Sequence, residues 1–183
     1  EICACLVGSE MCIRDSRCGK SVMLELIKDE LKASGVDSSQ FISINFEDMR
    51  YTYLQTAQAL HDEITKLASS IDGKVYLFFD EIQEVTDWEK CINSLRITLD
   101  CDVYITGSNA KLLSGELATY LGGRYVEFII YPFSFAEFLE LYHLTAPDES
   151  ISSCFQKYLV SGGMPYLSNL RYAEEPSLSL IHI

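Results

Sequence analysis

The sequence predicts an α/β protein in which a largely parallel sheet is flanked by helices, followed by the start of a small helical C-terminal region. Strand-like and helix-like segments alternate from residue 20 to residue 131, and repeated strand-helix units build parallel sheets. The run VYLFFDE (residues 75–81) is apolar until two carboxylates end it, as in a strand buried on both faces. Beyond Pro132 the pattern contains helices only.

The first half of the chain supplies two helices and two strands to this prediction. Apolar residues at positions 23, 26, 27 and 31 predict a helix from Lys20 to Ala33, and Gly35 follows where a helix stop is expected. The alternating, β-branched segment 41–46 predicts a strand. Apolar residues spaced from Leu54 onwards predict a second helix that ends near residue 68, before the buried strand 75–81.

The second half continues the alternation of strands and helices up to residue 131 and then contains helices only. A helical stripe from Trp88 to Leu99 is followed by a short buried strand at 103–106, and we expect Trp88 to anchor the helix on the sheet. A helix at about 112–121 and a strand at about 125–131 come next. Two further helices are predicted around residues 135–142 and 151–159.

Composition and net charge limit the classes of function that the sequence allows. The formal net charge is -13, with only 14 basic residues that are scattered along the chain, so we expect this segment to repel nucleic acid. Its apolar runs are too short to span a bilayer, which predicts a soluble protein with no membrane partner. The seven cysteines form no CxxC pair and the three histidines lack metal-ligand spacing; we expect buried free thiols and structural histidines.

The two ends look foreign to the rest of the chain. Residues 1–16 lack a starting Met and a basic leader, and together with residues 177–183 they resemble translated sequencing-adapter read-through. The alternative is a natural extension whose apolar ICACLV forms a strand. Under the first reading, residues 17–132 form the core and residues 133–176 form a helical lid or the start of a second domain.

A phosphate-binding signal opens the first predicted helix. In a phosphate-binding loop, backbone N–H groups at a helix N-terminus face the phosphates, a Lys adds a positive charge, and a Ser or Thr hydroxyl holds Mg²⁺. Gly19, Lys20 and Ser21 occupy those positions. A tripeptide alone is weak evidence, and a surface lysine at a helix start would look the same.

Polar residues at the ends of two later strands strengthen the signal. Asp80 and Glu81 suit a magnesium ligand and a base that polarises the attacking water, although a solvated strand end would also fit. Ser108 and Asn109 follow the next strand, where a side chain can position the water or cap a helix. Glu47 and Asp48 end the strand 41–46; we favour a solvated pair there over a role near the nucleotide.

The blocks RCGKSVMLELI, YLFFDEIQEV, YITGSNAKLLSGEL, LGGRY, YPFSFAEFLELY and YLVSGGMP, in that order, resemble the prokaryotic AAA+-type P-loop ATPase family that carries a second domain of uncharacterised function. The resemblance implies a P-loop NTPase fold of the AAA+-like class with an additional strand and a catalytic glutamate (ASCE). It also implies ATP, Mg²⁺ and a cytoplasmic location. The nucleotide-binding residues would then be Arg17, Cys18, Gly19, Lys20, Ser21 and Val22, with Ser21 and Asp80 on magnesium.

The loop departs from the family pattern at its front. The resemblance makes Arg17 the second arginine of a loop beginning Gly-x-Arg-Arg, but Arg14, Asp15 and Ser16 stand at the earlier positions. A glycine there lets the backbone approach the phosphates, and an aspartate repels them. We therefore expect this chain to bind ATP weakly or not at all, whereas a natural parent binds it.

The leading hypothesis is an Mg-ATP-dependent ATPase that couples its nucleotide state to a missing C-terminal domain. Its catalytic residues would be Glu81 as base, Asn109 as water sensor and Arg124 as an arginine finger acting in cis or on a neighbouring subunit, which would require self-association. One alternative is a slow nucleotide-gated switch or binding module. A small-molecule kinase is a weaker one, because no Arg-rich lid follows the core.

Overall fold

The structure, a computed structural model, describes residues 3–8, 19–107, 125–145 and 149–163. These residues form two compact units, the first ending at Ile130 and the second beginning at Tyr131. The elements of the first unit are β1 (Cys3–Gly8), α1 (Lys20–Ala33), η2 (Ser38–Gln40), β2 (Phe41–Asn45), η3 (Met49–Leu54), α2 (Ala57–Ala68), β3 (Val75–Asp80), η4 (Ile82–Glu84), α3 (Trp88–Thr98), β4 (Cys101–Gly107) and β5 (Tyr125–Ile130), where η marks a 3-10 helix. The second unit contains α6 (Phe135–Thr145) and α7 (Ile151–Ser161).

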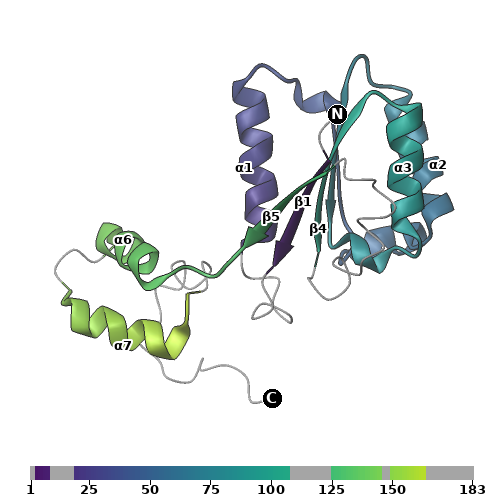
Figure 1. The fold of residues 1–183 in the computed structure, drawn as a ribbon. Coiled ribbons are helices and arrows are strands. Elements are labelled where there is room, and N and C mark those ends of the chain that lie inside the picture. The colour runs from purple at the N-terminus through teal and green to yellow at the C-terminus, as the bar shows by residue number, and fades with distance from the viewer. Residues whose placement is uncertain (1–2, 9–18, 108–124, 146–148, 164–183) are drawn as a thin grey trace. The chain divides into compact units, whose positions relative to one another are not determined.

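The five strands form one parallel sheet in the order β2-β3-β4-β1-β5 (Figure 1). β4 therefore lies between β1 and the acidic strand β3, as the additional-strand layout requires. The predicted α/β architecture, a parallel sheet flanked by helices, is confirmed. Because all strands run the same way, their carboxyl ends meet at one edge of the sheet, where ligands bind in such folds.

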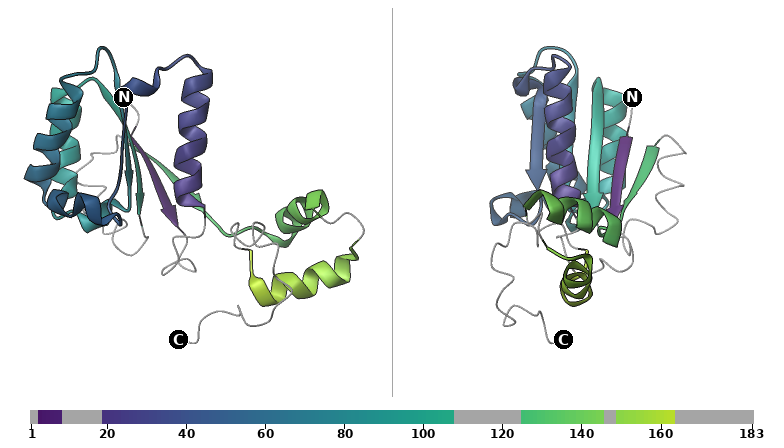
Figure 2. Two further views of the ribbon diagram at one scale, coloured as in Figure 1. Left: turned by 180° about the vertical axis from the view of Figure 1, so that it is seen from behind. Right: turned by 90° about the vertical axis from the view of Figure 1, so that its left-hand side faces the viewer.

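Helices cover both faces of the sheet. Helix α1 lies on one face, and α2 and α3 lie on the other (Figure 2). Alternate residues of β3 pack on opposite faces of the sheet. Leu77 and Phe79 belong to the larger core with α2 and α3, and Phe78 belongs to a smaller core with Leu24 of α1. Trp88 is buried in the larger core, as expected of a packing anchor. The sheet edge is thus supported from both sides.

Helix α1 has the predicted bounds, but only part of the predicted apolar stripe faces the sheet. Ile27 and Leu31 pack against the smaller core, whereas Met23 and Leu26 are 38% and 57% exposed. Leu24 and Lys28, outside the stripe, are buried. Lys28 is accommodated because its ammonium lies 5.0 Å from the centre of the Phe78 ring and donates to Ser43 Oγ at 2.8 Å. A lysine with a partner at its tip can line a helix–sheet contact that hydrophobicity alone would give to leucine.

The second predicted helix is divided in the structure. The 3-10 helix η3 ends at Leu54 and α2 begins only at Ala57. Thr56 caps α2 by accepting a hydrogen bond from the backbone N–H of Ala59 at 3.3 Å. Thr56 has an extended backbone and therefore separates η3 from α2. The spacing of the apolar residues did not reveal this break.

The N-terminal segment takes part in the fold. Cys3–Gly8 forms β1, which pairs with both β4 and β5. This strand is the one that the alternative reading of ICACLV predicts. That the segment is foreign in origin stays a prediction.

The second unit is held by aromatic side chains. The Phe135 ring lies 5.0 Å from that of Phe155 and 5.4 Å from that of Tyr158, which joins α6 to α7.

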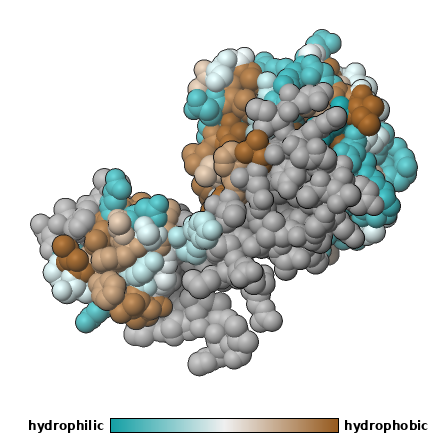
Figure 3. Space-filling view, viewed as in Figure 1, coloured by the Kyte–Doolittle hydropathy of each residue, from teal (hydrophilic) through white to brown (hydrophobic). Residues whose placement is uncertain are grey.

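Exposed apolar side chains remain on α7 and on α1, and hydrophobic residues gather over both helices in Figure 3. They are Ile151, Phe155, Leu159 and Val160 on α7, and Val22, Met23 and Leu26 on α1.

Two expectations about composition can be compared with the described residues. Cys91, Cys101 and Cys154 are free and buried there, as expected, and burial raises the pKa of the Cys91 thiol to about 12. No helix in the described ranges has the length and apolar character needed to cross a membrane.

Candidate functional site

Two acidic residues lie at the carboxyl end of β3. Asp80 is the last residue of the strand and pairs in register with Asn45 at the end of β2. Both Asp80 and Glu81 are buried, with 7% and 6% of their surface exposed. A buried carboxylate is costly unless polar groups surround it, so the contacts of these two residues define the site.

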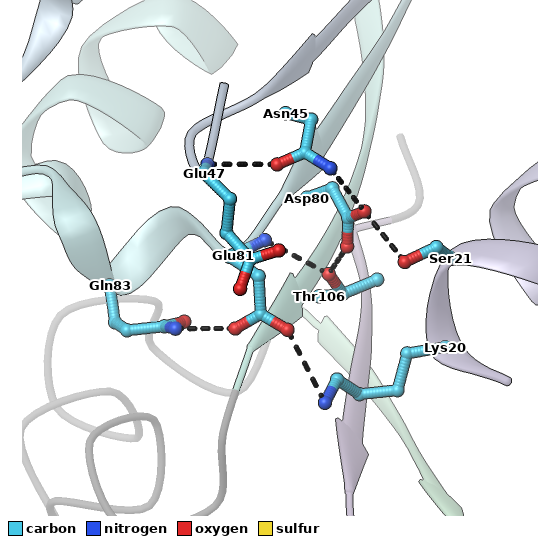
Figure 4. Close-up of polar contacts among 8 residues, drawn as sticks. All are labelled: Lys20, Ser21, Asn45, Glu47, Asp80, Glu81, Gln83 and Thr106. Carbon is cyan, nitrogen blue, oxygen red and sulfur yellow. Dashed lines mark hydrogen bonds and ion pairs between the residues drawn. The ribbon is translucent and has the colours of Figure 1, made fainter. Parts of the chain in front are cut away.

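Asp80 accepts hydrogen bonds from three elements. Ser21 Oγ donates to its Oδ2 at 2.7 Å, and Asn45 Nδ2 donates to the same oxygen at 3.2 Å. Thr106 Oγ1, at the end of β4, donates to Oδ1 (Figure 4). Helix α1, strand β2 and strand β4 together hold this carboxylate at the sheet edge.

Glu81 has a backbone conformation that is rare for a residue with a side chain. Its φ of 56° and ψ of 48° lie in the left-handed region, and strain of this kind concentrates at functional sites. Its N–H donates to Thr106 Oγ1 at 3.1 Å. The turn directs the Glu81 carboxylate back toward α1, where Oε1 lies 3.4 Å from the ammonium of Lys20.

Lys20 and Ser21 form the first turn of α1. The helix begins at Lys20 itself, preceded by Gly19 with a φ of 93°, so the unpaired N–H groups of the helix N-terminus lie beside these side chains. Only 2% of Lys20 is exposed. The ammonium is therefore held inside the site by the Glu81 carboxylate, with which it forms a buried ion pair.

Glu47 adds a further carboxyl group near the site. Burial, followed by the negative charges of Glu81 and Asp80, raises the pKa of Glu47 above its usual value, and the positive charge of Lys20 partly opposes this. Asp48, in contrast, caps η3 and pairs with Arg50. Glu47 is exposed and Asp48 is half-buried, which agrees with the predicted solvated position of Glu47, although the start of η3 turns the two side chains to different surroundings.

The structure brings together four of the residues predicted for the site: Lys20, Ser21, Asp80 and Glu81. Val22 is 60% exposed on α1. Gly19 directly precedes Lys20. The other predicted residues, Arg17, Cys18, Asn109 and Arg124, lie outside the described residues. The same holds for the helix predicted at about 112–121.

Three residues in these contacts were not predicted for the site: Asn45, Thr106 and Gln83. Asn45 and Thr106 end the strands on either side of β3 and contact Asp80. A polar residue at the end of an apolar strand, next to an acidic strand, was the available signal. Gln83 Nε2 donates to Glu81 Oε2, a contact that follows from the left-handed turn and has no sequence signal.

The donor set suits a small divalent cation. A hydroxyl and a carboxylate, Ser21 and Asp80, are hard oxygen ligands of the kind that Mg²⁺ uses in proteins together with phosphates and water. A cavity of about 290 Å³ is lined by both residues and also by Lys28, Ser43 and Asn45. The residues present therefore fit magnesium, and Lys20, which directly precedes Ser21 in α1, is a positive charge for phosphate.

Comparison with known proteins identifies the family. The sequence profile of a family described as an AAA domain matches residues 16–139, which is more than half of the chain. The chain belongs to this AAA family. The membership agrees with the resemblance to AAA+-type P-loop ATPases. The match ends at residue 139, within α6.

Two curated relatives of this AAA domain are uncharacterized proteins. One, from Haemophilus influenzae, is 41% identical over 160 residues, which cover 87% of this chain and 39% of the relative. The other, from Methanocaldococcus jannaschii, is 36% identical over 135 residues, covering 70% of this chain and 30% of the relative. The chain thus spans well under half the length of either relative.

Solved structures support the fold. The Aeropyrum pernix ORC1 protein, determined in complex with DNA, matches with a TM-score of 0.53 at 18% identity, covering 80% of this chain and 44% of that one. AMPPCP-bound DnaA from Aquifex aeolicus matches with a TM-score of 0.53 at 15% identity, covering 93% and 56%. At these identities the likeness shows the AAA fold alone.

Proposed function

We propose that this AAA domain binds Mg-ATP and hydrolyses it, and that its nucleotide state is coupled to a C-terminal domain in a longer protein. The observation that carries the proposal is the meeting of two pairs at one sheet edge. Lys20 contacts Glu81 at 3.4 Å, and Ser21 contacts Asp80 at 2.7 Å. A charge for phosphate, a ligand pair for magnesium and a base for water are thereby gathered within one site.

In this proposal each residue has one task. The Lys20 ammonium binds the β- and γ-phosphate oxygens. Ser21 and Asp80 would hold the magnesium ion, which would supply positive charge to neutralise the phosphates. Asn45 and Thr106 keep the Asp80 carboxylate in place. Glu81 accepts a proton from the attacking water. Asn109 would help to orient that water, and Arg124 would supply an arginine finger in cis or from a neighbouring copy.

The proposal is tested by restoring the front of the loop. The chain with Arg14→Gly, Asp15→Ala and Ser16→Arg, called here the loop-restored chain, should bind Mg-ATP in isothermal titration and release phosphate, whereas the unaltered chain binds weakly or not at all. Lys20→Ala in the loop-restored chain should remove binding, and Lys66→Ala, on an exposed lysine of α2, should not. Absence of binding by the loop-restored chain would contradict the proposal.

A second candidate function is a nucleotide-gated switch with slow turnover. The observation that favours it is the engagement of both Glu81 oxygens, one by Lys20 and the other by Gln83. A base held in this way is released for chemistry only when Lys20 moves to a phosphate. Steady-state phosphate release separates the candidates: binding without appreciable turnover supports the switch.

A further inference from the structure

Gln83 is the one amide side chain among the described residues that contacts Glu81. It extends from η4 to the carboxylate, on which Lys20 also converges from α1 (Figure 4). Its Nε2 donates to Glu81 Oε2, so Lys20 and Gln83 occupy different oxygens of the same carboxylate. When a phosphate draws Lys20 away, the Gln83 contact can remain.

The other end of the same amide lacks a partner. Gln83 Oε1 is buried, and it accepts no hydrogen bond from any group in the part of the chain that the structure describes. Leaving a buried acceptor unsatisfied costs folding free energy, so such a group in a site points to a donor that arrives with the ligand or the solvent. Oε1 and Nε2 share one carbon, so this acceptor belongs to the same amide group that contacts the Glu81 carboxylate.

We infer that Gln83 positions the attacking water together with Glu81. A water between the two residues donates one proton to the Glu81 carboxylate and the other to Gln83 Oε1, which leaves an oxygen lone pair free for the γ-phosphorus. The inference rests on the proposed ATPase function and deepens it. Gln83 is a positioning residue, and it gains and loses no proton.

The chemical step balances without Gln83 changing. The water oxygen forms a bond to the γ-phosphorus, and the bond from that phosphorus to the oxygen bridging to ADP breaks. One water proton passes to Glu81, and the products are ADP and inorganic phosphate. Gln83 lowers the barrier by fixing the direction of attack, which is the kind of contribution that orientation makes to catalysis.

The test replaces Gln83 in the loop-restored chain with Met, which keeps the length and removes both polar atoms. We expect kcat to fall about tenfold or more, while KM for Mg-ATP and the affinity for a non-hydrolysable ATP analogue stay within about twofold. The matched control is Gln58→Met. Gln58 Nε2 also donates to a carboxylate, that of Asp62, at 2.8 Å on the surface of α2, and its loss should leave kcat unchanged.

A second variant guards against a folding defect. Gln83→Glu keeps an acceptor and the side-chain size but replaces the N–H that holds Glu81 with a carboxylate that repels it, so kcat should also fall about tenfold or more. The melting temperature of each variant, measured beside kcat, identifies the variants that are folded. In addition, Gln83→Met should cause no further loss in a Glu81→Gln background, because the two residues act on one water. A folded Gln83 variant with parental kcat would overturn the inference alone, whereas a loop-restored chain without any turnover would overturn both the inference and the proposed function.

Discussion

Both units contain distinctive sequence motifs, but the motif residues of the two units have different physical roles. At the sheet edge, Lys20, Asp80 and Glu81 are charged groups buried against one another, and Glu81 has a strained backbone. Such groups cost folding free energy and are retained where chemistry needs them. In the second unit, the motif residues make caps and backbone contacts that specify the fold.

The motif PFSFAE illustrates the second kind. Ser134 Oγ accepts from the N–H of Glu137, and the Glu137 carboxylate accepts from the N–H of Ser134 at 2.7 Å. This reciprocal pair is a capping box at the start of α6. The motif SGGMP supplies Gly163, whose carbonyl accepts from the N–H of Phe133 at 2.6 Å. A distinctive motif is therefore not in itself a sign of a catalytic site; a buried, mutually opposed set of charges is a better one.

The largest expected effect comes from Glu81→Gln in the loop-restored chain. Removing the base should lower turnover by about 10²- to 10⁴-fold, the usual range for general base catalysis, while Mg-ATP binding is retained because Lys20 and Ser21 are unchanged. Phosphate release and isothermal titration measure the two effects separately. Glu30→Gln, on the exposed side of α1, is the control. Equal loss of binding and turnover would assign Glu81 a structural role like that of Glu137.

A change of similar size, but in stability, is expected at Gly163. A Cβ added there would lie 2.0 Å from the carbonyl oxygen of Phe133, so Gly163→Ala should destabilise the second unit by about 3 kcal/mol or more, as overpacking against backbone does. Hydrogen exchange in α6 and α7 measures this. The neighbouring Gly162→Ala is the control. Its φ of 73° and ψ of -174° cost a residue with a side chain about 1–3 kcal/mol, but the added Cβ meets no atom within 4 Å. A smaller effect at Gly163 than at Gly162 would refute the close contact.

The contrast also explains how far the sequence could be read. Lys20, Ser21, Asp80 and Glu81 were predictable because their chemistry requires those residue types at the ends of elements that hydrophobic patterns reveal. Thr106 was missed because a Thr in an apolar strand has ordinary β propensity. Gln83 was missed because its contact depends on the left-handed turn at Glu81, which no local pattern specifies. Lys28 was missed because its burial depends on Ser43 and Phe78, which are distant in sequence.

A moderate effect is expected from the α6 cap. Ser134→Ala should lower the stability of the second unit by about 1 kcal/mol, the usual contribution of an N-cap. Hydrogen bonds from the Ser134 hydroxyl and backbone N–H lower the pKa of Glu137 below its ordinary value of 4.5. The stabilisation is therefore present above the unfolded-state pKa and is lost as pH falls through the lowered folded-state pKa. Melts of α6 and α7 between pH 7 and acid should show this loss in the parent and less of it in Ser134→Ala.

The smallest effect is expected at Glu47, which belongs to neither kind of motif. Burial and then the negative charges of Glu81 and Asp80 raise its pKa. A further negative charge is therefore disfavoured at this place, and the Glu47 carboxylate should oppose a triphosphate bound beside it. Glu47→Gln in the loop-restored chain should tighten Mg-ATP binding by about two- to fivefold, a modest charge effect because Glu47 is largely exposed. In the parent, affinity should rise as pH falls through the raised pKa of Glu47, and the variant should lose that part of the pH dependence. Isothermal titrations of both proteins with Mg-ATP across the same pH series measure this difference. If the affinity of both proteins changes equally with pH, Glu47 lies too far from the nucleotide to oppose it. The acidic groups that raise the pKa of Glu47 would then act within the sheet edge alone.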